Sequence, residues 1–472
     1  MQIFQKKDLK KAIAHTTPLK RSLKTHDLIF LGIGAVIGTG IFVLTGKGAL
    51  TAGPALALSF LLAAICCGFT GLCYAEFSSM VPITGSAYTY AYVTFGEIVA
   101  FIIGWVLTLE YALSAATVSA GWSGYFTNLI GQMGLHLPVY LTAAAGTDPG
   151  TTTYFNLPAF LIVLVITWVL SLGINQTKRV NDTMVIIKLA VIILFMVLAV
   201  KFIKTANWSP FAPFGWYSHH QGQATGIWPA ASIIFFSFIG FDAVSSSAEE
   251  TVKPEKTIPK GVIFSLLIST VLYIAMTLVM TGVVKYPVFA NFLNAPILAV
   301  IKKMAMPWLS ILVSLGAILG MTTVILVLLY GQTRINYAMS RDGLLPKFFS
   351  AVSKKRQTPF KGTWFYGILI ALVSGLLNLN ILAELANIGT LSAFIIVCAG
   401  ILWMRHTHPH LHRDFKVPGV PFVPVLAIIF CLVLIAGLNW ITWAGFIIWL
   451  LIGLLVYFSF SKQHSKINLH KT

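Results

Sequence analysis

The sequence predicts an all-α polytopic membrane protein with twelve transmembrane helices. Three observations predict this class: 57% of the 472 residues are hydrophobic, 10% are charged, and the mean hydropathy is +0.85. A water-soluble protein carries about 25% charged residues, so this apolar excess cannot be hidden in one water-soluble core. The hydrophobicity excludes a disordered chain, and five cysteines in so long a chain exclude a disulfide scaffold.

Twelve apolar runs account for the predicted helices. A helix needs about 20 mostly apolar residues to cross a hydrocarbon core about 30 Å thick. The third and eighth runs exceed this length, so we expect them to be strongly tilted or to extend into a loop. No signal peptide is expected, because the first 26 residues are basic and polar. The runs extend over residues 27–49, 55–78, 94–129, 157–177, 181–201, 226–247, 261–284, 308–340, 362–379, 381–404, 423–438 and 441–459.

The Lys and Arg residues that give the net charge of +18 are distributed unequally between alternate loops. One set of loops, which includes both ends of the chain, holds 25 of the 32 Lys and Arg residues, and the other set holds six. Because cytoplasmic loops are enriched in Lys and Arg, both termini are expected in the cytoplasm and the chain in a plasma membrane. No aromatic-interleaved basic patch that would stack bases is present, so no nucleic-acid partner is expected.

The first ten runs divide into two sets of five. Corresponding runs begin about 200 residues apart, and since five is odd, the second set enters from the opposite side, as in transporters built from inverted repeats. Short loops alone also make spans recur regularly. The predicted order is a cytoplasmic segment, a first repeat, an external loop, a second repeat, a cytoplasmic loop, two further helices and a cytoplasmic tail. These segments are 1–26, 27–201, 202–225, 226–404, 405–422, 423–459 and 460–472.

Glycines interrupt the first run in mid-membrane. The segment GIGAVIGTGIF places Gly38, Thr39 and Gly40 in a row, and glycine weakens a helix by about 1 kcal/mol relative to alanine. Open backbone at this depth is tolerated only where it is buried or lines a cavity. Freed N–H groups suit a carboxylate and freed carbonyls suit an ammonium group, so this break would recognise a zwitterion. The alternative is that the glycines only allow close helix packing.

The sixth run is expected to break at the equivalent place, within FFSFIGFDAVSS. Gly240 permits the unwinding. Asp242 beyond it can cap the second half-helix, or it can act near a substrate ammonium group or in proton movement. Phe236, Phe238 and Phe241 are each expected to face lipid or core, and one of them could close over a bound substrate.

These segments carry a resemblance to a known family. GIGAVIGTGIF, FFSFIGFDAVSSSAEE and YGQTRINYAMSRDGLLPK (residues 330–347) resemble the amino acid–polyamine–organocation superfamily and, within it, the bacterial members of the cationic amino acid transporter family. The resemblance covers nearly the whole chain. It implies a LeuT-like fold of five-plus-five inverted repeats with discontinuous first and sixth helices, two extra C-terminal helices, and the substrate between helices one and six.

The resemblance also implies a substrate site. The carboxylate would bind Thr39 and Gly40 through backbone N–H groups and the Thr39 hydroxyl, and Gly38 would permit the turn. Leu328 in the eighth run would face the side-chain subsite, and a bulky apolar residue there favours small or neutral amino acids over arginine. The α-ammonium group would be received by the carbonyls of Val36, Phe236 and Ile239.

Two ionisable residues lie deep within apolar runs. Lys188 stands about 10 Å along the fifth run, at a cost of about 3 kcal/mol, unless its side chain extends to the interface. Because burial disfavours the charged form of an amine, Lys188 could exchange a proton. The resemblance suggests that its ammonium group replaces the sodium ion of sodium-driven relatives, which favours proton coupling. Glu110, in the third run, either marks an ion path or is a protonated structural residue.

The remaining polar features receive simpler interpretations. Glu384 is expected at the interface, and Arg334 and Arg341 in a cytoplasmic gate or in headgroup contact. His406, His408, His410 and His412 alternate in one loop without a ligand partner at metal-binding spacing, so a pH-sensitive loop is preferred to a metal site. The five cysteines are expected to be packed thiols.

The sequence thus predicts a secondary transporter that imports L-amino acids by alternating access, coupled to protons through Lys188, Glu110 or Asp242. Exchange of amino acids, or uptake of cationic amino acids alone, is the alternative, and a membrane-embedded enzyme is disfavoured because no convergent nucleophile, base or metal set is found. We expect no metal or organic cofactor. The monomer is expected to be the functional unit, with a small membrane subunit as an open alternative.

Overall fold

The structure of the chain is a computed structural model that describes residues 4–7, 21–83, 85–145, 152–220, 223–293, 295–353 and 358–466, with only the backbone at 174–178 and 379–381. Most of the described chain is helical. The α-helices are α2 (Thr25–Val36), α3 (Thr45–Ala52), α4 (Leu56–Met80), α5 (Ser86–Thr94), α6 (Glu97–Gln132), α7 (Leu157–Ser171), α8 (Ile174–Ala199), α9 (Ile227–Ile234), α10 (Ala243–Ser246), α11 (Pro254–Val283), α12 (Ile297–Met304), α13 (Pro307–Arg341), α14 (Phe360–Leu376), α15 (Leu379–Thr407), α16 (Phe422–Ala436), α17 (Trp440–Val456) and α18 (Lys462–His464).

Shorter helical turns connect and extend these helices. Two are π-helical: η2 (Gly40–Leu44), which continues into α3, and η11 (Tyr457–Ser461), which joins α17 to α18. The 3-10 turns are η3 (Gly53–Ala55), η4 (Val139–Leu141), η5 (Val200–Phe202), η6 (Thr205–Trp208), η7 (Phe235–Phe238), η8 (Ala248–Glu250), η9 (Tyr286–Phe292) and η10 (Lys347–Ser350).

The helices confirm a polytopic membrane protein. Eight helical stretches among the described residues are long and apolar enough to cross a membrane, and α7, α14 and α16 are shorter apolar helices. Each of the twelve predicted runs overlaps a helix, because apolar length is a local property that the sequence displays directly. Large apolar side chains such as Trp168 and Leu455 remain exposed on the outer surface, as expected where lipid replaces water.

Two details differ from the sequence prediction. The third run does not begin as a helix at residue 94, because Gly96, with φ +100°, separates α5 from α6. The eighth run agrees with the prediction and is one unbroken helix of 35 residues. The all-α prediction also missed an antiparallel pair of strands between α8 and α9, β1 (Ser218–His220) and β2 (Gln223–Thr225).

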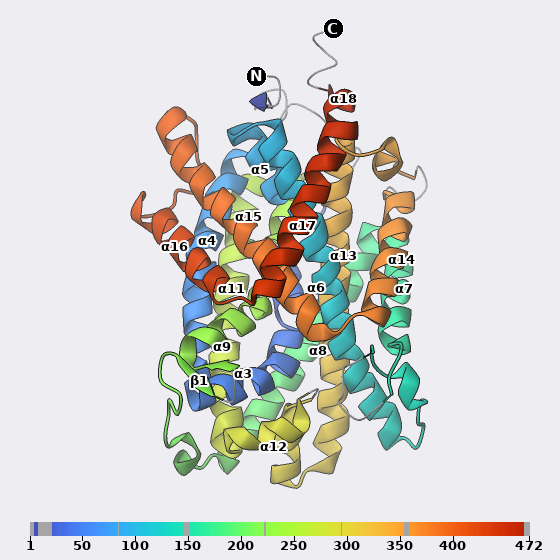
Figure 1. Cartoon of the computed structure of the whole chain (residues 1–472), viewed down its shortest axis with the longest axis vertical. Helices are drawn as coiled ribbons and strands as arrows, with labels where there is room; N and C mark the ends of the chain where they lie inside the picture. The colour runs from blue at the N-terminus through green and yellow to red at the C-terminus, as the bar shows by residue number, and fades with distance from the viewer. Residues whose placement is uncertain are drawn as a thin grey trace.

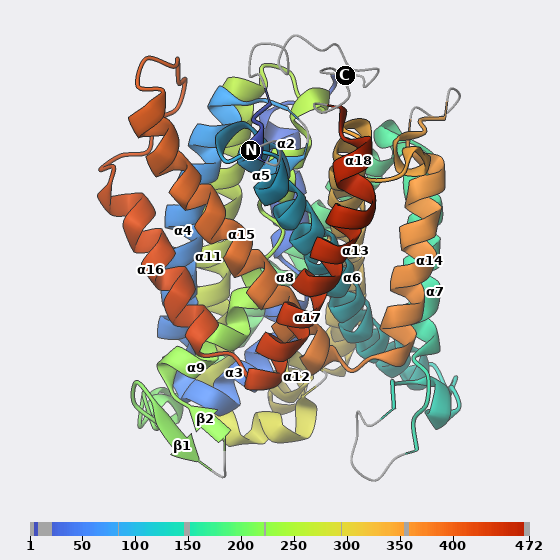
Figure 2. The same ribbon diagram turned by 45° about the horizontal axis from the view of Figure 1, so that its top comes forward.

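Both described ends of the chain lie at the same end of the helix bundle (Figure 1). Asp342, just after α13, holds them together: its carboxylate accepts from Lys7 Nζ at 2.7 Å, and its carbonyl accepts from the N–H of Lys466 at 3.1 Å. We call this end the terminal face. In the views of Figures 1 and 2, α7 and α14 pair along one edge, and α16 and α17 lie on the outside of the bundle.

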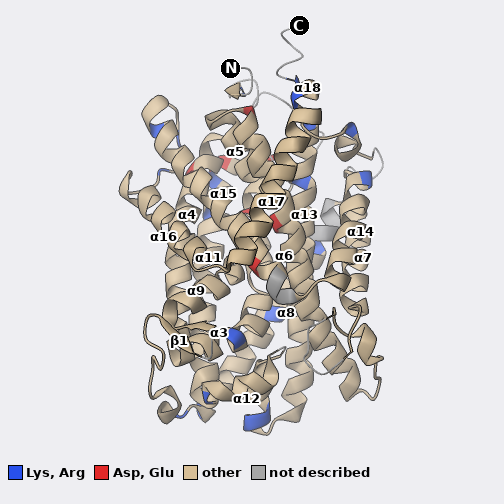
Figure 3. Cartoon of the chain, in the orientation of Figure 1, with Lys and Arg blue, Asp and Glu red and all other residues tan. Residues whose placement is uncertain are grey.

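The structure describes only part of the Lys and Arg residues counted in the charge asymmetry. Lys10, Lys11, Lys20, Lys354, Lys355, Arg356 and Lys471 lie outside the described residues, as does the side chain of Lys178. The remaining charged residues are coloured in Figure 3.

Candidate substrate site

The first helix is broken inside the bundle. Helix α2 ends at Val36, Ile37 is extended, and the chain becomes helical again at Thr39 and η2. The opening therefore lies at Ile37–Gly38, slightly before the predicted Gly38–Gly40. Close packing explains why glycine is needed here, since a Cβ added at Gly38 would lie 2.5 Å from a methyl carbon of Val324 in α13.

The sixth run is broken at its predicted glycine. Helix α9 continues into η7, Ile239 is extended, and Gly240 has φ +109°, a conformation that L side chains rarely adopt. Helix α10 follows from Ala243. The two breaks lie against each other, because a Cβ at Gly40 would lie 2.4 Å from Cβ of Ser237 in η7 and one at Gly240 would lie 2.9 Å from Cβ of Ala35.

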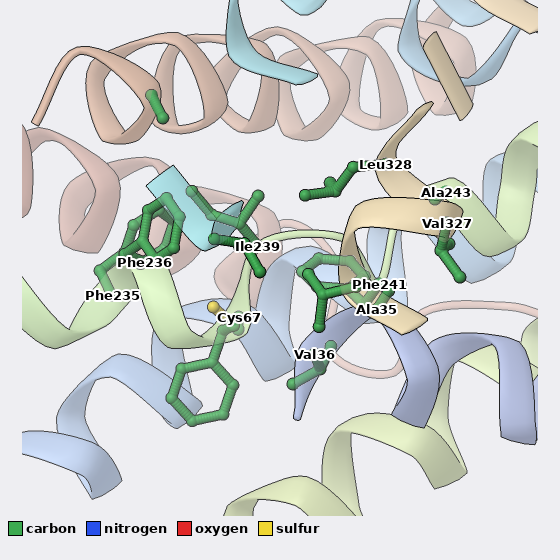
Figure 4. Packing of buried hydrophobic residues seen from close by; sticks show 14 of the residues in the cluster. Ala35, Val36, Cys67, Phe235, Phe236, Ile239, Phe241, Ala243, Val327 and Leu328 are labelled. Carbon is green, nitrogen blue, oxygen red and sulfur yellow. The ribbon is translucent and has the colours of Figure 1, made fainter. Parts of the chain in front are cut away.

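A small cavity lies between the two breaks, α6 and α13. Six of the eight predicted substrate-binding residues line it, from both breaks and from α13. Gly38 and Asp242 are not among the residues that line it. The lining residues are Ala35, Val36, Thr39, Gly40, Ser114, Val118, Phe236, Ile239, Val324 and Leu328. Figure 4 shows Val36, Phe236, Ile239 and Leu328 within the buried apolar packing around the breaks.

Of the three phenylalanines in this segment, the cavity involves Phe236. Phe238 instead packs against Phe60 and Tyr273, and Phe241 packs against Tyr74. Phe238 and Phe241 therefore belong to the core, which is one of the two environments expected for them.

The cavity offers polar groups on an otherwise apolar surface. The hydroxyls of Thr39 and Ser114 are buried and have no hydrogen-bond partner among the described residues. Beside the cavity, the hydroxyl of Tyr273 in α11 lies 2.7 Å from the carbonyl of Val36 and 2.7 Å from that of Ser237. Since a hydroxyl has one proton, it donates to one of these carbonyls at a time, and the other stays available to an ammonium group.

Lys188 reaches the first break from α8. Its fully buried ammonium group donates to the carbonyls of Ile33, Gly34 and Ile37 at 3.0, 3.2 and 2.7 Å. It also lies 2.9 Å from the hydroxyl of Thr323 in α13. The last carbonyls of a helix lack intrahelical partners and carry partial negative charge, so a cation is favoured there. The side chain therefore fills the space between α2 and α13 and does not extend to the interface.

Asp242 lies at the second break with a different partner. It occupies the N-cap position of α10, but its side chain makes no capping hydrogen bond. Instead, one carboxylate oxygen accepts from the hydroxyl of Tyr111 in α6 at 2.6 Å, and the other has no partner among the described residues. Asp242 is fully buried. The capping alternative is therefore wrong for this side chain, which links the second break to α6.

Glu110 is also buried in α6, next to Tyr111 in sequence. Neither of its carboxylate oxygens has a hydrogen-bond partner among the residues that the structure describes. A buried, unpartnered carboxylate favours the neutral form, because desolvation penalises the charge. Glu110 and Asp242 place two buried carboxyl groups on the side of the cavity toward the terminal face.

Ion pairs join the helices on the terminal face. Arg334 in α13 donates to Glu250 at 2.6 Å with both side chains buried, and Arg341 donates to Glu249 at 3.2 Å. The hydroxyl of Tyr330 also donates to Glu250. Both arginines thus pair within the protein rather than with headgroups. Burial raises the pKa of the Glu250 carboxyl, although Arg334 opposes this, so acidification through that pKa would neutralise Glu250 and remove this pair.

The other predicted features have structural explanations. Glu384 is half-buried and accepts from the hydroxyl of Thr442 at 2.9 Å. The alternating histidines are exposed: His406 lies in the last turn of α15 and His408, His410 and His412 lie in the loop after it, and the described residues contain no cluster of metal-ligating side chains. All five cysteines are buried and free, as predicted.

Sequence reasoning missed four hydroxyl residues of this region, Tyr111, Ser114, Tyr273 and Thr323, and the apolar lining residues Ala35, Val118 and Val324. The hydroxyls of Tyr111, Tyr273 and Thr323 bond to segments far away in the sequence, and Ser114 lines the cavity. A tyrosine hydroxyl in mid-membrane needs a partner, so Tyr111 and Tyr273 carried a usable signal. The two smaller hydroxyl residues carried none, because serine and threonine can bond back to their own helix.

Comparison with known proteins gives a consistent result. The amino acid permease family matches residues 23–460. The branched-chain amino acid permease BcaP of Bacillus subtilis is 52% identical over 99% of both chains, and the methylthioribose transporter of the same organism is 45% identical over 99% of both. The chloroplastic cationic amino acid transporter 9 of Arabidopsis thaliana is 36% identical over 82% of this chain and 67% of its own length.

Proposed function

The chain belongs to the amino acid permease family of the amino acid–polyamine–organocation superfamily, and from this membership we propose that it imports neutral L-amino acids by alternating access, coupled to protons. Membership makes it a multi-pass membrane transporter rather than an enzyme. The observation that carries the proposal is the cavity at which both broken helices meet. One end of this cavity offers groups for a zwitterion, and the other is apolar.

The substrate main chain is assigned to the breaks. The carboxylate would accept hydrogen bonds from the first N–H groups of the helix that restarts at Thr39 and from the unpartnered Thr39 hydroxyl. The α-ammonium group would donate to the carbonyls of Val36, Phe236 and Ile239. When the Tyr273 hydroxyl donates to the carbonyl of Ser237, the carbonyl of Val36 remains available as an acceptor, which supports this placement.

The substrate side chain is assigned to the wall formed by Val118, Val324 and Leu328. None of the lining residues is acidic, so nothing in the cavity would balance the charge of arginine or lysine. The apolar wall favours aliphatic side chains, in line with the name of the 52% identical relative. A polyol such as methylthioribose would leave several hydroxyls unpaired against this wall, which favours amino acids over that substrate.

Proton coupling is assigned to Lys188. Its ammonium group bridges α2 and α13, and release of its proton would remove the donor that joins the two helices. Glu110 and Asp242 are further proton carriers in this proposal, since both are buried carboxyl groups near the cavity. No metal or organic cofactor is required, and the monomer is the functional unit.

The proposed architecture is twelve spanning helices, with residues 27–201 and 226–404 as inverted repeats. Both termini would lie in the cytoplasm of a bacterial cell. The terminal face supports placing both termini on one side of the membrane, since the two described ends of the chain meet there at Asp342.

Uptake by the purified protein in liposomes tests the proposal. Labelled valine, alanine, arginine and methylthioribose would be compared under an inside-alkaline pH gradient, a sodium gradient and loading with internal amino acid. We expect valine uptake driven by the pH gradient without sodium. Uptake only in exchange for internal amino acid would replace import by exchange, and uptake only with sodium would refute the role of Lys188. Preference for arginine or methylthioribose would refute the substrate assignment.

A further inference from the structure

The wall of the cavity that faces the breaks contains one polar side chain. Helices α6 and α13 pack more extensively on each other than any other described pair, and they contribute Ser114, Val118, Val324 and Leu328 to the lining. The members of each pair lie one helical turn apart, so they face the same side of their helix. Three of the four are apolar, and Ser114 is the exception.

The hydroxyl of Ser114 is available for a ligand. Among the other hydroxyls of α6, those of Thr108, Thr117 and Ser119 donate to carbonyls of their own helix. The Ser114 hydroxyl makes no such bond and has no partner among the described residues, although the side chain is fully buried. Those of Ser123 and Thr127 also have no partner among the described residues, but they do not line the cavity. Buried polar groups are normally paired, so an unpaired one that lines a cavity indicates a partner that binds there.

We propose that Ser114 determines whether the transporter accepts a hydroxyl group on the substrate side chain, so that threonine is carried as well as branched aliphatic amino acids. This inference rests on the proposed function, in which the main chain of the substrate binds at the breaks and its side chain meets the wall. Threonine has the shape of valine with a hydroxyl in place of one methyl group. That hydroxyl pairs with Ser114, and the remaining methyl packs on the apolar wall.

The test compares threonine with valine, which match in shape, in the wild-type protein and in Ser114→Ala in liposomes. The ratio of threonine to valine uptake efficiency is expected to fall by about tenfold in the variant, because a buried substrate hydroxyl loses its partner. The change should lie in KM, since the hydroxyl takes part in binding only. Ser119→Ala is the matched control: it removes a hydroxyl from the same helix that donates to the carbonyl of Ala116 and does not line the cavity.

The possible outcomes distinguish a failure of this inference from a failure of the proposed function on which it rests. Wild-type uptake of valine without threonine, or an unchanged ratio in Ser114→Ala, overturns the role of Ser114 and leaves amino acid import standing. An equal loss for both substrates assigns Ser114 a structural role and also overturns the inference. Failure of the wild-type protein to take up either amino acid refutes the proposed function itself.

Discussion

The two helix breaks lie against each other but meet side chains of opposite charge type. At the first break, Lys188 donates to the carbonyls that end α2. At the second, the carboxylate of Asp242 lies at the start of α10. The C-terminal end of α2 carries partial negative charge, which suits the ammonium group of Lys188, whereas the carboxylate of Asp242 accepts from the hydroxyl of Tyr111 in α6. Two similar backbone openings therefore have different partners: the ammonium group of a residue in α8 bonds to the first, and the hydroxyl of a residue in α6 bonds to the carboxylate at the second.

The largest effect is expected from removing the cation at the first break. Lys188→Ala removes the ammonium group that donates to the carbonyls of Ile33, Gly34 and Ile37. The Ile33 carbonyl still accepts from the N–H of Ile37 and the Gly34 carbonyl from the hydroxyl of Thr323, so the Ile37 carbonyl loses most, at a cost of about 1–3 kcal/mol. We expect uptake driven by a pH gradient to fall about 100-fold, as measured with labelled valine in liposomes. Lys201→Ala, at an exposed position, is the control and should behave as the wild type. Retention of pH-driven uptake by Lys188→Ala would show that the two breaks do not differ in the way proposed.

A smaller effect is expected from separating the two breaks. In Gly40→Ala the new methyl group would lie 2.4 Å from Cβ and 2.8 Å from Cα of Ser237, so backbone must move. Overpacking of this kind costs about 1–3 kcal/mol, which corresponds to a loss of transport of about tenfold or more. Gly68→Ala in α4 is the matched control, because its methyl group would meet no atom within 4 Å. Equal uptake by both variants would mean that close contact between the breaks is not needed.

The smallest effect is expected at the carboxylate of the second break. Asp242→Asn keeps an acceptor for the hydroxyl of Tyr111 and keeps a side chain able to cap a helix, but it removes the charge. A hydrogen bond to a charged group is worth about 1 kcal/mol more than one to a neutral group, so we expect uptake to fall by roughly fivefold. The pH dependence of uptake should also flatten. A variant with the rate and pH profile of the wild type would assign Asp242 a role that needs no charge, in contrast to Lys188.

The sequence predicted the helices better than the contacts among them. Run 308–340 corresponds closely to α13 (Pro307–Arg341), because the length and periodicity of an apolar run can be read from the adjacent residues alone. The opening at Gly240 was predicted for the same reason, since only glycine readily adopts a positive φ there. The start of the third run was misplaced because Gly96 looks like any other glycine in an apolar run until its φ is known.

The partners at the candidate site depend on packing between distant segments. Lys188 and Ile37 are 151 residues apart, and Tyr111 and Asp242 are 131 apart. No pattern within either run specifies which partner it meets. For Asp242, local reasoning offered the N-cap as an alternative because the residue precedes a half-helix, and the tertiary contact with Tyr111 overrode it.

Because both described chain ends contact Asp342, the distance between them can be used to follow motion of α13. Lys7 and Lys466 contact the same residue at the end of α13, so fluorophores attached near them would sit close together while these contacts hold. Any motion of α13 that releases one end would separate the pair and lower energy transfer. A single molecule labelled at its two ends would in this way report each turnover as a change in emission.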